Sequence, residues 1–420
     1  MLLKSLMKLV ILDQLEAINN KENLVIRDTY SNLVQYKGSS ALVLKGLRRT
    51  GKSTLLKQLI ISKFSDSFYY FNFDDDRVFG FTVDDFQNLI ETFIELFGRR
   101  KNVFFDEIQN VRGWELFINR MLREGYRVFI TGSNSNLLSQ ELGTHLTGRH
   151  IDLELYPFSF QEYLRAKDLQ KIVEGDYNTS ARATLSAEFN KYFLTGGMPE
   201  VVLSGEAAIL THLINDVIQK DIVTRYSVRK PAEIKKILRF ILANVSNETT
   251  YRGLTIATDS KSENTVKKYI QYLEETYIIF EVSRYDKKLR RRDKNPKKFY
   301  CIDNGIIINN VPTFIENKGG LLENMVAINL KRMQKKFYFF RDKDQSEADF
   351  VIPSERQIIQ VCYELNEQNR KREIKGLVRA RREINAEKFL IITLNQEESI
   401  KLDGLTIDVE PIWLWLAKNH

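Results

Sequence analysis

The chain has few cysteines and histidines and no long uninterrupted apolar segment. Its 420 residues include two cysteines, Cys301 and Cys362, and both lie in apolar runs that we interpret as strands. Two thiols cannot build a disulfide framework, and the four scattered histidines give no Cys/His zinc spacing. These absences exclude a disulfide-stapled or zinc-stapled domain and favour a reducing, cytoplasmic location.

No apolar run reaches the roughly 18 residues that a membrane span needs, so we predict no membrane association. Residues 1–20 begin with an apolar look, but Lys4, Lys8, Asp13 and Glu16 interrupt them and no small-residue cleavage site follows. We therefore expect an amphipathic helix there and not a signal peptide. The length favours two or three domains.

The net charge of +8 is concentrated in one place. Residues 284–298 contain nine Lys or Arg and two Asp, a net charge of +7. Such a block favours an acidic partner, with nucleic acid first. The alternative is a solvated surface loop.

A short apolar run, Ala41–Leu44, predicts a buried strand that leads into the sequence Gly-Leu-Arg-Arg-Thr-Gly-Lys-Ser. Apolar residues at helical spacing follow, and strand, G-x-x-x-x-G-K-S and helix together predict a loop that cradles phosphates. Its glycines let backbone N–H groups turn inward, its lysine reaches the β- and γ-phosphates, and its serine binds Mg²⁺. The predicted ATP·Mg²⁺ contacts are Gly46, Leu47, Arg48, Arg49, Thr50, Gly51, Lys52, Ser53 and Thr54.

A second strand, Val103–Phe105, delivers Asp106 and Glu107 at its carboxyl end, where open α/β sheets bind ligands. We expect Asp106 to hold Mg²⁺ and Glu107 to polarise the attacking water. Alone, an acidic pair at this point would be read as the cap of the next helix.

A third strand, 127–131, ends in a Gly-Ser-Asn turn, so Ser133 or Asn134 is a candidate sensor of the γ-phosphate. Turn formation alone would also explain these residues. Arg149 precedes a fourth strand, 150–155, and is a candidate for stabilising transition-state charge. A surface salt bridge is the equally weighted alternative for Arg149.

Together these residues resemble the AAA-type ATPases of the Orc-like and STAND-like branch, and more narrowly prokaryotic members that carry a C-terminal restriction-nuclease-like domain. The similarity is carried by residues 46–54, Phe-Asp-Glu-Ile-Gln at 105–109 with Trp114, Thr-Gly-Ser at 131–133, Gly148 with Arg149, Tyr156–Glu162, and Gly-Gly-Met-Pro-Glu at 196–200.

The resemblance implies an α/β fold with a three-layer α/β/α ATPase core over 1–159 and a helical lid over 160–230. It also implies a winged helix-turn-helix over 231–312 and a nuclease-like α/β domain over 313–420. In such proteins the Gly-x-Pro segment lies near the nucleotide, which here places Pro199 there.

The middle of the chain has helical patterns at 234–245, 251–258 and 262–274 and strand patterns at 278–282 and 298–302. The basic block lies between the two strands, where a wing would be. We predict contact with DNA phosphates more than with bases. The predicted contact residues are Lys267, Lys268, Lys288, Arg290, Arg291 and Arg292. The alternative is a wing that binds protein.

From residue 319 the pattern helix, three strands, helix, strand resembles the PD-(D/E)xK nuclease fold. Glu323 and Asp349 match its first two acidic positions, but Gln360 and Cys362 stand where active members have an acid and a lysine. Glu364 could replace the acid, whereas no replacement for the lysine is visible. We therefore expect a degenerate site and a domain that contacts DNA or protein.

The resulting hypothesis is an ATP-hydrolysing, DNA-associated switch, monomeric or a small homo-oligomer. The alternatives are a signalling ATPase that binds a protein partner and an ATP-gated, metal-dependent nuclease.

Overall fold

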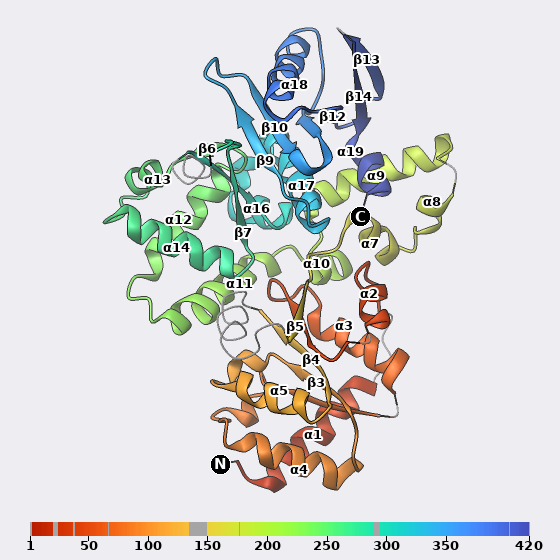
Figure 1. Cartoon of the computed structure of the whole chain (residues 1–420), viewed down its shortest axis with the longest axis vertical. Coiled ribbons are helices and arrows are strands. Elements are labelled where there is room, and N and C mark those ends of the chain that lie inside the picture. Colours follow the sequence, from red (N-terminus) through yellow and green to blue (C-terminus); the bar gives the residue numbers. More distant parts are fainter. Residues whose placement is uncertain are drawn as a thin grey trace. The chain divides into compact units, whose positions relative to one another are not determined.

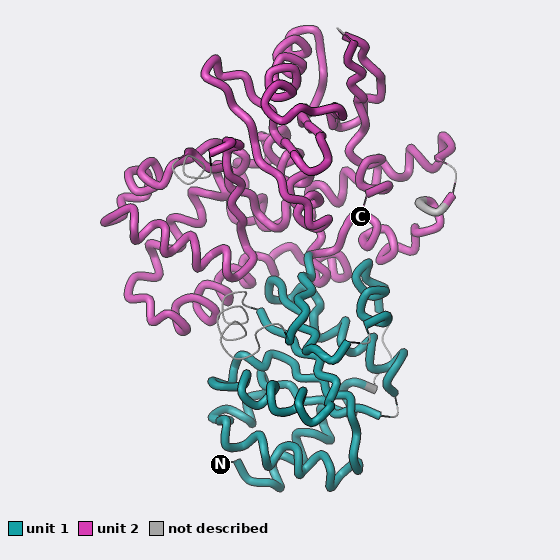
Figure 2. Tube along the Cα trace, viewed as in Figure 1, with its two compact units in different colours: residues 1–156 teal, residues 157–420 magenta. Residues whose placement is uncertain are grey.

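The computed structural model describes residues 2–19, 24–36, 38–65, 67–133, 149–175, 177–288, 295–402 and 404–419. They form two compact units, residues 1–156 and 157–420 (Figure 2). Within these ranges each helix is too short or too polar to cross a bilayer. The finer domain boundaries predicted at 159, 230 and 312 stay predictions.

The first unit is built on a five-stranded parallel sheet. Its spatial order is β2 (Phe68–Asn72), β3 (Asn102–Asp106), β4 (Arg127–Gly132), β1 (Ala41–Lys45) and β5 (His150–Glu154). The strands predicted from the apolar runs are confirmed. Because all five run the same way, their carboxyl ends meet at one edge, and β1 lies in the interior of the sheet beside β4.

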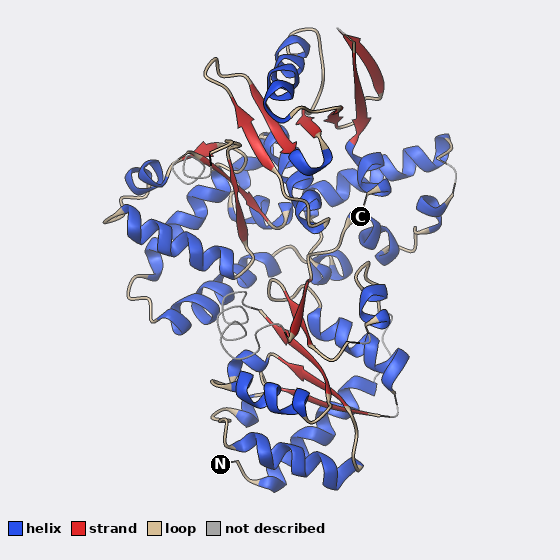
Figure 3. Cartoon of the chain, viewed as in Figure 1, coloured by secondary structure: helices blue, strands red, loops and turns tan. Residues whose placement is uncertain are grey.

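Helices cover both faces of this sheet (Figure 3). The successive β1 residues Leu42 and Val43 belong to opposite cores, as side-chain alternation along a strand requires. Val43 packs with α1 (Lys4–Asn19), α4 (Asp85–Phe97) and α5 (Trp114–Arg123), whereas Leu42 packs with α2 (Tyr30–Gln35) and α3 (Lys52–Leu59). The unit is thus a three-layer α/β/α fold, and α1 confirms the predicted N-terminal helix.

The second unit begins with five helices, α7 (Phe160–Ala166), α8 (Lys171–Glu174), α9 (Thr179–Thr195), α10 (Pro199–Ser204) and α11 (Ile209–Asp216). Ser159 starts α7 with a capping box that includes Glu162. Helices α7 and α9 pack against α19 (Ile412–Lys418), and Gln161 Nε2 donates to the Ala417 carbonyl at 2.7 Å. This helical segment therefore shares one body with the C-terminal end of the described chain.

Next along the chain come α12 (Pro231–Ala243), α13 (Tyr251–Ala257) and α14 (Glu263–Glu275), with a three-stranded antiparallel sheet whose first strand lies between α12 and α13. Its spatial order is β6 (Glu248–Thr249), β8 (Lys297–Cys301) and β7 (Ile279–Ser283). The three helices and two longer strands lie where the sequence predicts them. Two further helices, α16 (Asn304–Asn310) and α17 (Lys318–Arg332), lead into the last sheet.

The last sheet has six strands and mixed direction. Its spatial order is β13 (Glu398–Leu402), β14 (Leu405–Pro411), β12 (Lys388–Thr393), β11 (Gln357–Val361), β10 (Glu347–Ile352) and β9 (Tyr338–Arg341). The sequence predicts β9 to β12 and the helix α18 (Arg370–Ile384), but not β13, β14 or α19. Together the sheets and helices confirm the predicted α/β class.

Helix α18 packs closely on β10 (Figure 1). A Cβ atom on Gly376 would lie 1.7 Å from the Glu347 carbonyl oxygen, so only glycine permits this approach. The contact fixes which face of α18 turns toward the sheet.

Candidate nucleotide site and a second lysine–carboxylate cluster

The phosphate loop, residues 46–53, connects β1 to α3 at the carboxyl edge of the parallel sheet. Gly46 has φ +151°, and a Cβ there would lie 2.2 Å from the Leu155 carbonyl oxygen. Gly51 has φ +92° and precedes the first turn of α3. Both positions need a residue without a side chain, and together they produce the turn that a phosphate-binding loop requires.

Lys52 is only 4% exposed and lies across this loop. Its ammonium donates to the carbonyls of Gly46 and Leu47, at 3.1 Å each, and lies 3.8 Å from Glu107 Oε1. Because these partners are mainly neutral carbonyls, the positive charge of the ammonium is only partly compensated and can attract an anion. Lys52 is where the sequence predicts it to be.

Asp106 is fully buried beside the loop. Its carboxylate accepts hydrogen bonds from the hydroxyls of Thr131, Tyr70 and Ser53. Burial raises the pKa of Asp106, and the charge of Glu107 raises it further. A Mg²⁺ ion would relieve both effects, so Ser53 and Asp106 fit the predicted ion.

Glu107 follows with a left-handed backbone, φ +53°. Its N–H donates to Thr131 Oγ1 at 2.9 Å, and its carboxylate accepts a hydrogen bond from Gln109 Nε2. Gln109 Nε2 also lies 3.5 Å from the hydroxyl of Ser133, the predicted sensor. Two side chains to which the sequence analysis gave no role, Thr131 and Gln109, therefore orient the acidic pair.

Arg27 is a further support that the sequence analysis missed. Its guanidinium donates to the Thr50 carbonyl at 2.7 Å and to the Tyr156 carbonyl at 2.6 Å, and it is buried. These bonds tie the phosphate loop to the end of the first unit. A lone arginine 23 residues before Thr50 carries no local signal of this role.

The remaining loop residues are placed as follows. Leu47 and Thr50 are buried, Arg48 lies 3.6 Å from Asp74, and Thr54 is exposed. Arg49 has a left-handed backbone, φ +66°. All belong to the loop or the first turn of α3, as predicted.

Arg149 lies at the opposite end of β1 from the phosphate loop, and its role in stabilising transition-state charge stays a prediction. Arg149 immediately precedes β5, whose first residue pairs with Ala41, the first residue of β1. The loop follows the other end of β1, so the full strand length separates Arg149 from it. Arg149 instead donates to Asn119 Oδ1 at 3.1 Å.

Two other predicted contacts are untested. Asn134 lies outside the described residues. Pro199 occupies the first turn of α10 in the second unit, so its predicted contact with nucleotide stays a prediction.

A second lysine meets carboxylates in the other unit. The Lys298 ammonium lies 2.8 Å from Glu323, 2.6 Å from Glu347 and 3.3 Å from Asp349, and Lys298 is 2% exposed. We call these four residues the Lys298 cluster. The sequence shows no obvious replacement for the motif lysine, but β8 supplies a lysine from the basic block that lies near Glu323 and Asp349.

Lys298 is the counterion that the three carboxylates of the cluster share. The nearby carboxylates raise the pKa of the Lys298 ammonium despite its burial. Burial, and next the charge of Glu323, raise the pKa of Asp349. Among the described residues no group of three or more His, Cys, Asp or Glu is arranged to hold a metal ion. The ammonium already lies between the carboxylates, so they do not fit the metal that the nuclease fold implies.

Gln360 and Cys362 lie beside this cluster without completing it. Gln360 accepts a bond from the Asp349 N–H at 3.3 Å and donates to Glu373 at 2.8 Å. The Cys362 thiol donates to the Glu364 carbonyl, and burial raises its pKa to about 11. Both side chains are used for internal bonds, and the departure from an active nuclease site stays a prediction.

The predicted DNA contacts divide into two groups. Lys267 and Lys268 on α14, and Lys288, are exposed. Arg290, Arg291 and Arg292 lie outside the described residues. Lys297 and Lys298, which the sequence analysis counted in the basic block, are buried.

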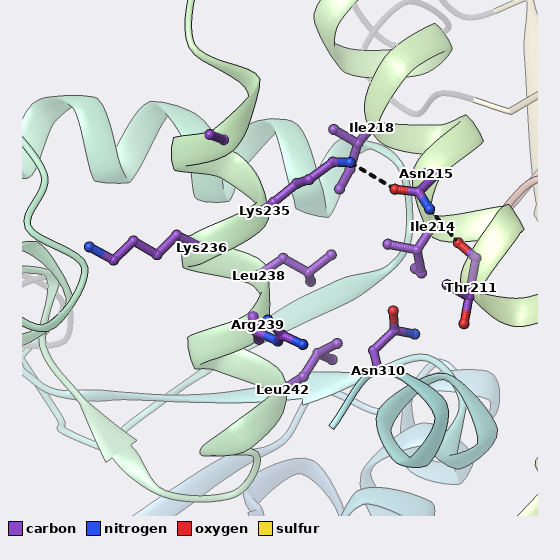
Figure 4. A pocket seen from close by; sticks show the side chains of 11 residues that line it. Thr211, Ile214, Asn215, Ile218, Lys235, Lys236, Leu238, Arg239, Leu242 and Asn310 are labelled. Carbon is purple, nitrogen blue, oxygen red and sulfur yellow. Dashed lines mark hydrogen bonds between the residues drawn. The ribbon is translucent and has the colours of Figure 1, made fainter. Parts of the chain in front are cut away.

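A pocket of about 410 Å³ lies between α11, α12 and α16 (Figure 4). Ile214, Ile218, Leu238 and Leu242 form much of its wall, and Lys235 donates to Asn215 at 2.8 Å. Its lining residues include no carboxylate, thiol or histidine. The pocket therefore lacks the groups needed for acid–base or metal chemistry.

Three family models match the chain. Residues 38–164 match an AAA domain, residues 186–312 match a domain of unknown function (DUF8612), and residues 318–415 match a second domain of unknown function (DUF4143). The AAA match, the parallel sheet and the phosphate loop define a nucleotide-binding AAA-type P-loop ATPase domain.

The uncharacterized protein MJ1544 of Methanocaldococcus jannaschii is 35% identical over 433 residues, which cover 98% of this chain and 95% of that protein. The chain belongs to the same family as this archaeal protein. An uncharacterized protein of Haemophilus influenzae is 29% identical over 412 residues, covering 93% of this chain and 98% of its own length.

Among solved structures, Cdc6p from Pyrobaculum aerophilum aligns over 71% of this chain and 98% of its own. The identity is 12% and the TM-score is 0.27, values that support no conclusion about function.

Proposed function

We propose that the chain is an ATP-hydrolysing, Mg²⁺-dependent switch that associates with duplex DNA. One observation carries the enzymatic part: Lys52, Ser53, Asp106 and Glu107 meet at the carboxyl edge of one parallel sheet. Phosphoryl transfer to water needs a loop that binds the phosphates, a pair of ligands for Mg²⁺ and a carboxylate that orients the water.

Each residue has a distinct part in this proposal. The loop N–H groups and Lys52 bind the β- and γ-phosphates, while Ser53 and Asp106 hold Mg²⁺, which neutralises charge on the phosphates. Glu107 orients the attacking water and accepts its proton. Gln109 and Thr131 are positioning residues, because each bonds to Glu107 or Asp106.

Association with DNA is proposed for the region around α14. Three helices with a small antiparallel sheet, one strand between the first two helices and two after the third, favour a winged helix, with α14 as the helix for the major groove. Exposed Lys267, Lys268 and Lys288 support contact with phosphates, and Arg290 to Arg292 extend the same charge in the sequence. We further propose that residues 160–230 act as a lid whose state depends on the nucleotide.

A signalling ATPase with a protein partner is the second candidate. It is favoured by the burial of Lys297 and Lys298, which removes two charges from the basic block. The Lys298 cluster gives no support to an ATP-gated nuclease, since an ammonium already stands between the carboxylates.

The test is ATP turnover by wild type, Lys52→Ala and Lys57→Ala, each with and without duplex DNA. Lys57 lies on the same helix but outside the loop, so it controls for loss of a lysine from α3. We expect Lys52→Ala to lower turnover by about 100-fold or more and Lys57→Ala to change it little. Equal turnover in all three proteins would contradict the enzymatic proposal.

The DNA arm separates the two partner classes. Binding at low salt that weakens as salt rises supports DNA association, whereas no binding at low salt supports a protein partner. Unchanged proteolysis and hydrogen exchange of residues 160–230 on addition of ATP would contradict the switch.

A further inference from the structure

Helix α18 is strongly basic and lies outside the region assigned to DNA so far. Its 15 residues contain seven Lys or Arg and two Glu, a net charge of +5. Four of the basic residues recur at intervals of three, four and three, which places them on one face of a helix. We call this set the α18 stripe: Arg372, Lys375, Arg379 and Arg382.

The packing of α18 fixes the direction of this face. Gly376, Leu377 and Ala380 are buried, and Gly376 lies directly against the Glu347 carbonyl. A helix held by its small residues against β10 cannot rotate without a backbone clash. Arg372 and Arg379 lie four residues before and three residues after Gly376, so they stand beside the packed side of α18, whereas Lys375 and Arg382 lie farther from it.

Two cavities adjoin along the stripe. Arg372 and Lys375 line a cavity of about 590 Å³ that also contains the Lys298 cluster. Arg379 and Arg382 line a second cavity, of about 710 Å³, and Arg341 and Asp344 border both. The stripe thus borders both cavities, of which the first has four Lys or Arg and six Asp or Glu in its lining.

The far wall of the second cavity is also basic. It includes Lys287 and Lys288, from the start of the basic block, and Lys343. Seven Lys or Arg and four Asp or Glu line this cavity, a net charge of +3. Some of these charges are paired within the protein, because Lys287 lies 3.3 Å from Glu383 and Arg379 lies 3.6 Å from Asp344.

We propose that the α18 stripe binds the sugar–phosphate backbone of duplex DNA. The inference rests on the proposed DNA association and names a surface for it that is separate from α14. Arg372 to Arg382 span about 15 Å of helix axis. The same length of duplex carries about four phosphates on each strand, so the spacing of the stripe matches a run of phosphates.

The chemistry favours a phosphate backbone over an acidic peptide. Three of the four side chains are arginines, whose planar guanidinium binds two phosphate oxygens at once. Arg372 is 79% exposed at its side chain even though it contacts Glu373. Arg372 and Arg382 are exposed and Arg379 is partly exposed, so the stripe offers several forks to a polymer with regularly spaced charges.

The test uses the double variant Lys375→Glu with Arg382→Glu in the full chain. Both residues are exposed, so reversal leaves the core intact. The matched control is Arg381→Glu with Lys401→Glu, which makes the same charge change at exposed positions outside the stripe. Binding is measured by fluorescence anisotropy with a labelled duplex of about 25 base pairs, from low to moderate salt.

We expect the stripe variant to bind at least about 10-fold more weakly at low salt, and its salt slope to fall by about two. The control should stay within about twofold of wild type. Equal melting temperatures of the three proteins show that folding is retained.

The outcomes separate the two claims. If wild type binds DNA and the stripe variant binds as well as the control does, the stripe is not the contact, while DNA association stands. If wild type binds no DNA at low salt, the association itself fails, and the stripe fails with it.

Discussion

The two units each bury a lysine beside carboxylates, but the two lysines are held in different ways. Lys52 bonds to two carbonyl oxygens and lies 3.8 Å from one carboxylate. Lys298 lies within 3.3 Å of three carboxylates. The first ammonium keeps its charge for a ligand, whereas the second is neutralised by the protein. A buried lysine with acidic neighbours is thus a binding group in one unit and an internal counterion in the other.

The largest expected effect is on ATP turnover, which should depend on the nucleotide site and not on the Lys298 cluster. Glu107→Gln should lower ATP turnover by about 100- to 10,000-fold because it removes the base that orients water. ATP binding should persist, since the phosphate loop is intact. The matched control is Glu323→Gln in the Lys298 cluster, which should leave turnover unchanged. Steady-state hydrolysis and nucleotide titration measure both, and equal losses in the two variants would contradict the distinction.

The next effect concerns stability. Lys298→Met should destabilise the second unit by about 3–5 kcal/mol, because it leaves buried carboxylates without their counterion. Lys52→Met should cost the first unit only about 1 kcal/mol, since its partners are mainly carbonyls. Hydrogen exchange of peptides from α17 and β10, compared with α3 and β3, reports each unit separately. If Lys52→Met lost more stability than Lys298→Met, Lys52 and not Lys298 would be the lysine that its unit needs as a counterion.

A third test concerns Glu274, a partly buried carboxyl whose pKa is raised by its surroundings and which, unlike the carboxylates around Lys298, is stabilised by binding a proton. Burial, and next the charge of Glu281, raise the pKa of Glu274 from 4.5 to about 7. Because the folded pKa lies above the unfolded one, the stabilisation is fully present below about pH 4 and is lost as pH rises to about 7. The loss is about 3 kcal/mol.

Glu274→Gln removes this dependence. The stability of the variant relative to wild type should therefore rise between about pH 4 and pH 7. This difference in stability is measured by chemical denaturation at several pH values, with hydrogen exchange in α14 as the readout. A pH-independent difference would mean that Glu274 does not titrate in this range.

The smallest expected effect concerns the support of the catalytic carboxylate. Gln109→Ala should lower turnover by about 10-fold, because Glu107 loses the side chain that orients it. Gln109→Glu should be worse, since it places a like charge beside Glu107. ATP affinity should change less than turnover in both variants. A loss of affinity without a loss of turnover would place Gln109 in binding and not in orientation.

The phosphate loop could be predicted from the sequence because its parts are contiguous. The eight residues between a strand and a helix contain the whole sequence signal, and the two glycines give the backbone the turn that the loop needs. Asp106 and Glu107 were also predictable, because an apolar strand aims its last residues at the same edge of a parallel sheet. Helix α3 followed from its apolar spacing alone.

The supporting residues could not be predicted in the same way. Arg27 bonds to Tyr156, 129 residues away, and Lys298 reaches Asp349, 51 residues away. No local sequence pattern predicts such pairs. Because Lys298 lies in a basic block, the sequence favours an exposed side chain there and not a buried one. Strand β13 was missed because three of its five residues are exposed, so little apolar pattern marks it. The separation of Arg149 from the loop was not predicted, because the sequence does not show which strands pair or in which direction they run.

The origin of Lys298 has a practical consequence for dividing the chain. The acidic residues of its cluster lie on α17 and β10, but the ammonium comes from β8, before the predicted boundary at 312. A fragment that starts at residue 313 would keep three carboxylates and lose their cation. Any recombinant piece meant to preserve the C-terminal sheet should therefore begin upstream of Lys297, whatever the sequence boundaries suggest.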